Sequence, residues 1–310
     1  MSLRIAFFGT PDFAVPSLRA LLGEGFDVAV VVTQPDRPQG RSRSQLVPPP
    51  VKEVAREHGL PVLQPDTPST PDAMDALRAY APDLGVVVAY GHILKPDLLA
   101  LPTRGMVNVH ASILPALRGA APIQHALLQG FETTGVSIMQ LDQGMDTGPV
   151  LLTAPTPIAP DETAGELTER LAELGAMALI EALALQSVGE LRPAPQDHAR
   201  ATYAPKIDQE QARVRWEEPA DRIARQLRAL DPRPGAWTTY EGKRLKLFGA
   251  REGGPTDAAP GTVLEVKPGL IIDTGQDALQ VLDVQPEGKG RMGAPDWARG
   301  RAITPGARLG

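Results

Sequence analysis

One short segment places an amide and an imidazole close together. In MVNVHASILP, residues 106–115, an apolar strand pattern holds Asn108 and His110 two residues apart, so both side chains are expected on one face of a strand. The amide offers hydrogen-bond donors, and the imidazole exchanges a proton near neutral pH. The pair could therefore stabilise developing charge and move protons at the end of that strand.

A second polar loop follows a strand-like segment at residues 135–140. Its sequence, LDQGMDTG at 141–148, carries two aspartates beside glycines, which let the backbone approach a ligand closely. We expect Asp146 of this loop to meet His110. Spacing alone leaves two interpretations open, because three such side chains can also form a hydrogen-bond network that only supports the fold.

Alternating strand and helix patterns position these loops. Short apolar runs predict strands at 3–8, 28–32, 61–63, 84–89 and 106–109, and helical patterns lie between them at 14–19, 51–57 and 72–79. This alternation is typical of an α/β fold with a Rossmann-like, mostly parallel sheet. Such sheets bind ligands at the carboxyl ends of their strands, where the polar loops lie.

The chain changes character after a long predicted helix at 163–185. A Pro-containing stretch follows, then an amphipathic helix at 220–230 and short runs typical of strands at 237–240, 244–248, 261–266, 270–273 and 279–284. We therefore expect three parts: a larger α/β domain at 1–190, a linker at 191–207 and a small OB-like β-barrel at 208–310.

Composition excludes several kinds of chemistry. The 310 residues contain no cysteine, so disulfides, thiolate nucleophiles, iron-sulfur clusters and thiolate zinc sites are ruled out. The sequence also lacks a GxxxxGK[ST] phosphate loop, a GxSxG nucleophile turn and an HExxH metal helix, and its first loop has one glycine where a dinucleotide fingerprint needs three. We expect no metal.

Charge and hydropathy bear on location and partners. The chain has no apolar run of membrane-spanning length and its start lacks an export signal, so we expect a cytoplasmic protein that does not enter a membrane. The net charge of −6 argues against a general nucleic-acid binder. From Lys206 onward, however, 17 basic residues face 15 acidic ones, so the C-terminal part is mildly basic.

Ordered sequence blocks along almost the whole chain carry a resemblance to one family. They are FFGTPDFAVPSL at 7–18, TQPDRPQGR at 33–41, VVVAYG at 86–91, NVHASILP at 108–115, RGAAPIQ at 118–124, GVSIMQLDQGMDTGPVL at 135–151, YAPKID at 203–208 and PGTVL at 260–264. With these blocks the sequence resembles the methionyl-tRNA formyltransferases. The resemblance extends into the second predicted domain.

The resemblance implies transfer of a formyl group from 10-formyltetrahydrofolate to the α-amino group of methionine on initiator tRNA. It also implies that the family's catalytic Asn, His and Asp fall on Asn108, His110 and Asp146. Two hydrogen-bond donors would stabilise the oxyanion of a tetrahedral intermediate, and the carboxylate would support the imidazolium and proton transfer. The first domain would then be the formyltransferase domain.

The resemblance further implies where folate and tRNA bind. Folate would lie at the strand ends, against Ser112, Ile113, Leu114, Pro115, Tyr90 and Gly91. The arginine-rich loop after the second strand would reach the acceptor end of the tRNA, and basic residues of the barrel would contact the tRNA as well. These tRNA-binding candidates are Arg37, Arg41, Arg43, Lys206, Lys243, Arg244 and Lys246.

The sequence departs from the family pattern at three places. Residues 42–44 read Ser-Arg-Ser where relatives commonly have Gly-Lys-Lys, Ala111 replaces a glycine, and residues 116–117 read Ala-Leu where an Arg-Trp pair is usual. One positive charge is therefore missing from the arginine loop. These departures concern the lining of the substrate side and leave Asn108, His110 and Asp146 intact.

Two other functions are compatible with parts of this sequence pattern. A folate-dependent formyltransferase that acts on a small amine would share the three polar residues but would need neither the arginine loop nor the C-terminal barrel. A folate-binding or RNA-binding protein without activity would not need the three residues together. We expect the tRNA enzyme, acting as a monomer.

Overall fold

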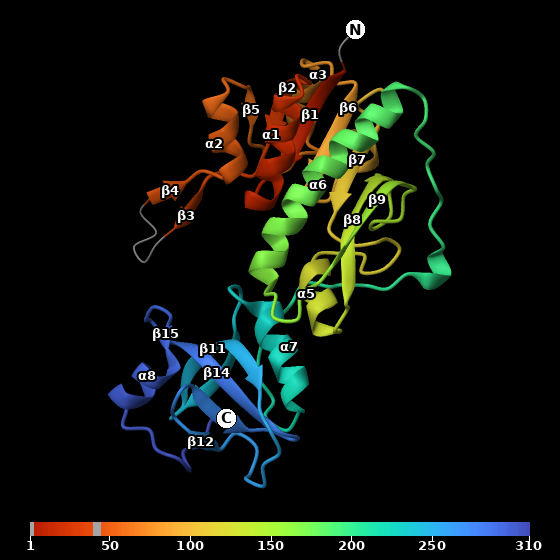
Figure 1. Ribbon diagram of the computed structural model, residues 1–310. Helices are drawn as coiled ribbons and strands as arrows, with labels where there is room; N and C mark the ends of the chain where they lie inside the picture. Colours follow the sequence, from red (N-terminus) through yellow and green to blue (C-terminus); the bar gives the residue numbers. More distant parts are fainter. Residues whose placement is uncertain (1–2, 40–44) are drawn as a thin grey trace. The chain divides into compact units, whose positions relative to one another are not determined.

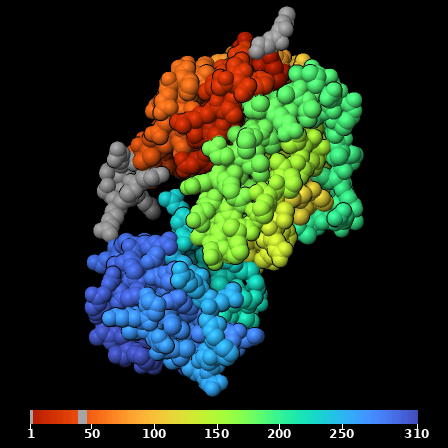
Figure 2. Space-filling model, in the orientation of Figure 1, coloured from red at the N-terminus to blue at the C-terminus, as the bar shows by residue number. Residues whose placement is uncertain are grey.

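The computed structural model describes residues 3–39 and 45–310, which divide into two compact units (Figure 1). The first unit comprises residues 1–119, 133–157 and 168–203, and the second comprises residues 120–132, 158–167 and 204–310. The chain therefore crosses between the units several times. In Figure 2 the blue C-terminal residues gather into one compact body.

A seven-stranded sheet organises the first unit. Its order is β5-β2-β1-β6-β7-β8-β9, with parallel pairing from β5 to β7 and antiparallel pairing from β7 to β9. The strands are β1 Arg4–Gly9, β2 Asp27–Val32, β5 Val62–Leu63, β6 Leu84–Val88, β7 Met106–His110, β8 Thr133–Gln140 and β9 Val150–Pro157. The mostly parallel, Rossmann-like sheet predicted from the sequence is thus confirmed.

Helices connect and cover these strands. They are η1 Asp12–Ala14, α1 Val15–Gly23, α2 Pro50–Glu57, α3 Pro71–Arg78, α4 Pro96–Leu99, α6 Ala164–Ser187 and η2 His198–Arg200. Four of them, α1 to α4, have proline in the first turn, where the missing N–H interrupts no helical hydrogen bond. Figure 1 shows α6 crossing one face of the sheet.

An apolar cluster covers the face of the sheet that carries the polar strand end. It includes Phe8 of β1, Val32 of β2, Tyr90 after β6 and Met106 of β7, all almost fully buried. Because side chains alternate along a strand, Met106 shares its face with Asn108 and His110. The cluster therefore packs against the first residue of β7, Met106, and Asn108 and His110 lie toward the polar carboxyl end of the same strand.

The arginine-rich loop begins next to a partly buried ion pair. Lys52 of α2, 7% exposed, places Nζ 2.6 and 2.7 Å from the two carboxylate oxygens of Asp36. Gln64 Nε2 donates to Asp36 Oδ1 and to the carbonyl of Gln34, each at 2.8 Å. These bonds lower the pKa of Asp36, with the bond from Gln64 contributing most and that from Lys52 next.

Beyond that pair the chain forms an antiparallel ribbon of β3 Arg37–Gln39 and β4 Gln45–Val47. The sequence patterns did not predict these two strands. Arg37 begins the ribbon and its side chain donates to Gln34 Oε1. Arg41 and Arg43 lie outside the described residues, so the structure places only Arg37 of the three loop arginines.

The second unit is built on an antiparallel, curled sheet of the half-barrel type. Its order is β10-β11-β14-β13-β12, with β15 paired to β14. The strands are β10 Ala236–Tyr240, β11 Lys243–Glu252, β12 Val263–Glu265, β13 Leu270–Asp273, β14 Ala278–Pro286 and β15 Met292–Gly293, and the helices are α5 Pro122–Leu128, α7 Ala220–Leu230 and α8 Ala294–Gly300. The predicted small C-terminal β domain is confirmed.

Helix α6 packs closely against Val109 of β7, on the face of the sheet opposite to Asn108 and His110, and this packing can be tested. A methyl group added at Gly175 of α6 would lie 2.7 Å from Val109 Cγ1, a buried and conformationally stiff side chain, whereas one added at Gly23 of α1 meets no atom within 4 Å. Alanine improves helix propensity by about 1 kcal/mol over glycine. We expect Gly23→Ala to stabilise the protein and Gly175→Ala to destabilise it by about 1–3 kcal/mol through overpacking.

Urea unfolding of both variants measures this difference, with the unchanged chain as reference. Equal stabilisation by the two substitutions would show that α6 does not press on β7 as described.

The depressed pKa of Asp36 predicts a pH-dependent contribution to stability. The charged carboxylate is favoured in the folded state, so its contribution is complete above the ordinary pKa of 3.8 and is lost as the pH falls through the lower folded value. Asp36→Asn should therefore be less stable than the unchanged chain at pH 7, and the gap should narrow below about pH 4.

Unfolding free energies measured by urea at pH 7 and pH 3 test this expectation. Asp75→Asn is the matched control, because it removes only an exposed ion pair with Arg78 and should change stability little at either pH. A gap for Asp36→Asn that is the same at both pH values would contradict the assignment.

Candidate active site

The carboxyl end of β7 presents Asn108 and His110. In the ladder Asn108 is paired with Val87 of β6 and Met139 of β8, so its backbone is held on both sides. His110 is 5% exposed, and Asn108 is half-buried. Within the described residues the Asn108 side chain has no hydrogen-bond partner, which leaves its amide available to a ligand.

The two ring nitrogens of His110 face different groups. Nε2 lies 3.1 Å from the carbonyl oxygen of Leu117, which can only accept, so Nε2 carries a hydrogen. Nδ1 lies 3.7 Å from Oδ2 of Asp146, a distance suited to an ion pair but longer than a hydrogen bond. Nδ1 therefore faces the carboxylate without being bound to it.

The Asp146 residue has an unusual backbone conformation, and its carboxylate accepts one backbone hydrogen bond. Its φ of +54° lies in the left-handed region, which is uncommon outside glycine. Oδ2 accepts a hydrogen bond from the backbone N–H of Gly119 at 2.7 Å. The structure thus brings His110 and Asp146 together, and one segment, residues 117–119, contacts both.

Hydrogen bonds within the segment that follows His110, and from it to Ser137 of β8, hold that segment. Ser112, 1% exposed, donates through Oγ to the carbonyl of Ala116 at 2.6 Å. Ser137 Oγ donates to the Ser112 carbonyl and accepts from the Leu114 N–H. Leu114 is buried, while Ile113 and Pro115 keep partial exposure. Of the four predicted folate-lining residues in this segment, Ile113 and Pro115 present the most surface.

The loop after β6 is joined to the loops after β1 and β2. The Tyr90 carbonyl accepts from Thr10 Oγ1 at 2.9 Å and from Gln34 Nε2 at 3.1 Å. Gly91 has a φ of +87°, and a methyl group there would lie 2.4 Å from Gln34 Nε2. Glycine at this position therefore permits both the turn and the contact.

The Tyr90 side chain points into the apolar cluster. It is 2% exposed and packs edge-on against Phe8 with ring centroids 5.5 Å apart. Burial raises the pKa of Tyr90 to about 12, so the phenol stays neutral at pH 7. Its hydroxyl has no hydrogen-bond partner among the described residues. Tyr90 is thus a core side chain whose backbone reaches the strand ends.

The strand register in the second unit places Arg244 and Lys246 on one face of the sheet and Lys243 at a position of the opposite face. Trp237 is paired across β10 and β11 with Lys246, and Thr239 with Arg244, so these side chains share the outer face. The Arg244 guanidinium lies 4.1 Å from the Trp237 ring centre, a cation–π contact. Lys243 has the opposite strand parity, and Lys206 is exposed before the sheet begins.

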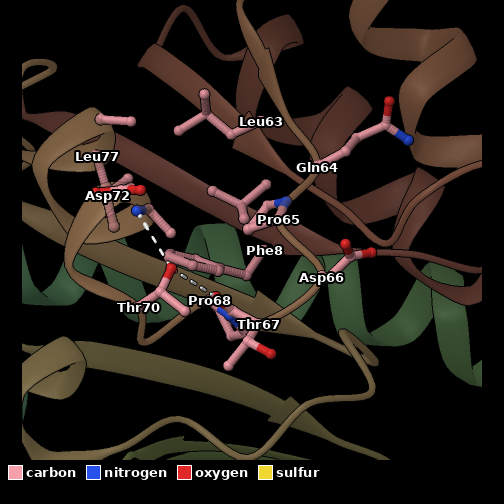
Figure 3. A pocket seen from close by; sticks show the side chains of 13 residues that line it. Phe8, Leu63, Gln64, Pro65, Asp66, Thr67, Pro68, Thr70, Asp72 and Leu77 are labelled. Atoms are coloured by element: carbon pink, nitrogen blue, oxygen red, sulfur yellow. Dashed lines mark hydrogen bonds between the residues drawn. The ribbon is translucent and has the colours of Figure 1, made fainter.

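A cavity of about 420 Å³ lies in the first unit, at the ends of β1, β2 and β5 and beside the start of α3. Figure 3 shows the Phe8 ring among the side chains of the loop at 63–70 and of α3. The cavity is lined by Phe8, Val32, Leu63, Gln64, Pro65, Asp66, Thr67, Pro68, Thr70, Asp72, Ala73, Ala76 and Leu77. None of the site residues predicted from the sequence lines it, and the only sequence signal was the Pro-rich run after residue 63.

Within residues 3–39 and 45–310, no three His, Asp or Glu side chains are grouped so that they could hold a metal ion. In the same part of the chain, no helix is both long and apolar enough to span a bilayer.

Comparison with known proteins gives two family matches along the chain. Residues 3–183 match the formyl transferase family, and residues 206–302 match the formyl transferase C-terminal domain. A methionyl-tRNA formyltransferase from Myxococcus xanthus is 50% identical over 306 residues, which cover 98% of this chain and 97% of that relative.

Solved structures share the fold at lower identity. The methionyl-tRNA formyltransferase from Clostridium thermocellum has a TM-score of 0.59 at 17% identity, covering 90% of this chain and 98% of that one. HypX from Aquifex aeolicus, in complex with tetrahydrofolic acid, has a TM-score of 0.65 at 20% identity and covers 96% of this chain and 47% of HypX. Given the match of both domains and the identity along nearly the whole sequence, the chain belongs to the methionyl-tRNA formyltransferase family.

Proposed function

We propose that this protein transfers the formyl group of 10-formyltetrahydrofolate to the α-amino group of methionine esterified to initiator tRNA. One observation carries the proposal: His110 and Asp146 come from separate loops and lie 3.7 Å apart at a strand end, in a chain 50% identical to a methionyl-tRNA formyltransferase. The half-buried Asn108 amide lies on the same face of β7.

The proposed reaction begins with attack by the amine nitrogen on the formyl carbon. A new C–N bond forms, and the electron pair of the C=O bond moves to the formyl oxygen. The Asn108 amide and protonated His110 would donate hydrogen bonds to that oxyanion. The intermediate then collapses: the C=O bond re-forms and the bond to folate N10 breaks, leaving formylated methionine and tetrahydrofolate.

The hydrogen bond from His110 to Leu117 assigns a role to each ring nitrogen. Nε2–H is occupied by the Leu117 carbonyl, so Nδ1 is the nitrogen that would meet the reacting groups. Nδ1 faces the Asp146 carboxylate at 3.7 Å and is not hydrogen-bonded to it. Nδ1 and the carboxylate therefore both keep hydrogen-bonding capacity for a ligand or a water that lies beside them.

Proton balance requires a route from the attacking amine to the leaving nitrogen. The amine loses one proton on forming the amide, and folate N10 gains one as it leaves. We assign to Asp146 the orientation of a water that carries this proton, which is general acid-base catalysis without a covalent enzyme intermediate. His110 and Asn108 then act on the oxygen, and Asp146 acts on the nitrogens.

The folate site is proposed at the strand ends that flank β7. Ile113 and Pro115 would offer apolar surface, Ser112 and Leu114 would support them from the core, and Tyr90 and Gly91 would contribute backbone groups. A flat ring system suits apolar walls with a few convergent polar groups. The rigid bonding of the loop after His110 favours a preformed wall on this side.

The tRNA is proposed to contact basic residues of both units. Arg37 at the base of the ribbon, with Arg41 and Arg43 further along the loop, would contact the acceptor end. Basic residues of the second unit, Lys206, Lys243, Arg244 and Lys246, would contact the phosphate backbone elsewhere. In this scheme residues 1–190 form the catalytic domain, 208–310 the tRNA-binding domain, and 191–207 connect them.

We also propose that the protein acts in the cytoplasm as a monomer. The site residues discussed above all come from one chain, so the proposed chemistry needs no second copy.

A formyltransferase for a small amine is the main alternative. It would use the same three polar residues but would not require the basic outer face of β10 and β11, where Arg244 and Lys246 lie. A binding protein without activity is the second alternative, and the close approach of His110 and Asp146 disfavours it. Labelled formyltetrahydrofolate supplied with methionyl initiator tRNA, and in a parallel reaction with a small amine, tests the proposal directly: label on methionine supports it, and label only on the small amine overturns it.

Substitution of His110 separates catalysis from binding. His110→Ala should lower kcat by about 10²- to 10⁴-fold, the usual contribution of a group that moves protons or stabilises an oxyanion. Asp146→Asn should also act on kcat, because it keeps the shape but removes the negative charge. The affinity of both variants for methionyl-tRNA, measured by filter binding, should change little. If the kcat of His110→Ala equalled that of the unchanged chain, His110 would have no part in the mechanism.

Substitution in the arginine loop should instead affect tRNA use. Arg41→Ala should raise KM for methionyl-tRNA and lower the slope of log KM against log salt by about 1, as expected for one lost phosphate contact. The KM for folate should stay the same. Arg192→Ala is the control, since among the described residues the Arg192 side chain bonds only to the nearby carbonyls of Gly189 and Leu191. Equal loss of folate and tRNA use by Arg41→Ala would indicate a disturbed loop.

A further inference from the structure

An arginine is buried beside the proposed catalytic residues without an acidic partner. Arg118 is 2% exposed, yet no carboxylate lies within ion-pair distance of it in the described part of the chain. Its guanidinium donates to Gln196 Oε1 through Nε at 3.2 Å and through Nη2 at 2.7 Å. Nη2 also lies 3.2 Å from His198 Nδ1, which must accept because a guanidinium only donates. Burying a permanent charge on neutral acceptors is costly, so a role beyond packing is indicated.

Gln196 links Arg118 to the Asp146 loop by hydrogen bonds on both sides of its amide group. Because Arg118 occupies its oxygen, the amide orientation is determined, and Nε2 points the other way. Nε2 donates to the carbonyl of Asp146 at 2.9 Å and to the carbonyl of Gly148 at 2.7 Å. Gln196 is itself 8% exposed, so these bonds are shielded from water. They tie down the backbone on which the Asp146 carboxylate is mounted.

The same contacts close a ring around the proposed catalytic pair. Leu117 accepts from His110, and Gly119 donates to the Asp146 carboxylate. Arg118, the residue between them, reaches through Gln196 to the Asp146 backbone. Of these three consecutive residues, Leu117 holds the imidazole, Gly119 holds the Asp146 carboxylate, and Arg118 acts through Gln196 on the Asp146 main chain.

We propose that Arg118 and Gln196 are positioning residues that set the separation of Asp146 from His110 for formyl transfer. Neither touches the reacting atoms. The inference rests on the proposed function, because it assigns the pair a purpose only if His110 and Asp146 do the chemistry. A shift of about 1 Å in a catalytic group can cost about 10²-fold in rate, so the effect should appear in kcat.

Gln196→Glu is the sharpest test. The carboxylate still accepts from Arg118, now with opposite charge, so the buried arginine keeps a partner. The glutamate carboxylate has no N–H to donate to the carbonyls of Asp146 and Gly148. One of its oxygens faces these two carbonyls instead, and no hydrogen bond can form there. We expect kcat for formylation of methionyl-tRNA to fall about 10²-fold, with KM for methionyl-tRNA within about threefold of the unchanged chain.

A matched control exists in the second unit. Gln226 Nε2 likewise donates to two backbone carbonyls, those of Gln211 at 2.8 Å and Arg213 at 3.1 Å. Gln226→Glu makes the same chemical change there, and its kcat should equal that of the unchanged chain. Urea unfolding of both variants shows whether each is folded under the assay conditions.

Each outcome decides the proposal. Loss of kcat by Gln196→Glu alone, with KM retained, supports it. Unaltered kcat, an equal loss of kcat by both variants, or a change confined to KM overturns it.

If Gln196→Glu does not fold, Arg118→Lys replaces it as the test. The lysine ammonium keeps the positive charge but cannot make the forked contact with Gln196, and a kcat equal to that of the unchanged chain would overturn the proposal. An unchanged chain that formylates no methionyl-tRNA refutes the proposed function instead, which distinguishes the two failures.

Discussion

The hydrogen bond from His110 Nε2 to the Leu117 carbonyl is the interaction on which the site depends. It uses one ring nitrogen, so it determines which nitrogen faces Asp146. The backbone that provides it turns sharply: Leu117 and Gly119 both have positive φ, as does Asp146 across the site. Non-glycine residues in this region cost about 1–3 kcal/mol and are found where surrounding contacts hold them. Here those contacts are the hydrogen bonds that join residues 117–119 to His110, Asp146 and Gln196.

A second constraint joins the loops at the ends of the parallel strands. The Tyr90 carbonyl accepts from Thr10 and Gln34, and the Gln34 carbonyl accepts from Gln64, which also bonds to Asp36. The base of the arginine-rich loop and the proposed folate loop therefore share one hydrogen-bond network. This arrangement places a proposed tRNA contact and a proposed folate contact on the same rigid support, which suits an enzyme that must align two large substrates.

The sequence patterns predicted the parallel strands and the long helix well, and they failed at particular elements for physical reasons. β9 contains Pro155 and Pro157, which weaken a strand pattern, and the structure tolerates them because β9 lies at the sheet edge. The helices α4 and α5 are only four and seven residues long, too short for a periodic signal. Gln196 could not be singled out, because it stands in a Pro-containing stretch whose partners are about 50 and 80 residues away.

By itself, the sequence determined the chemical types and their local placement: an amide and an imidazole on one strand face, a carboxylate in a glycine-flanked loop, and no thiol anywhere. Strand periodicity and residue chemistry are local properties, so they can be inferred without coordinates. Only the tertiary structure decided that His110 and Asp146 meet, which ring nitrogen is occupied, and that a buried Arg118 holds the loop through Gln196. Those outcomes depend on antiparallel pairing of β7 with β8 and on contacts between distant segments, whose geometry no local pattern encodes.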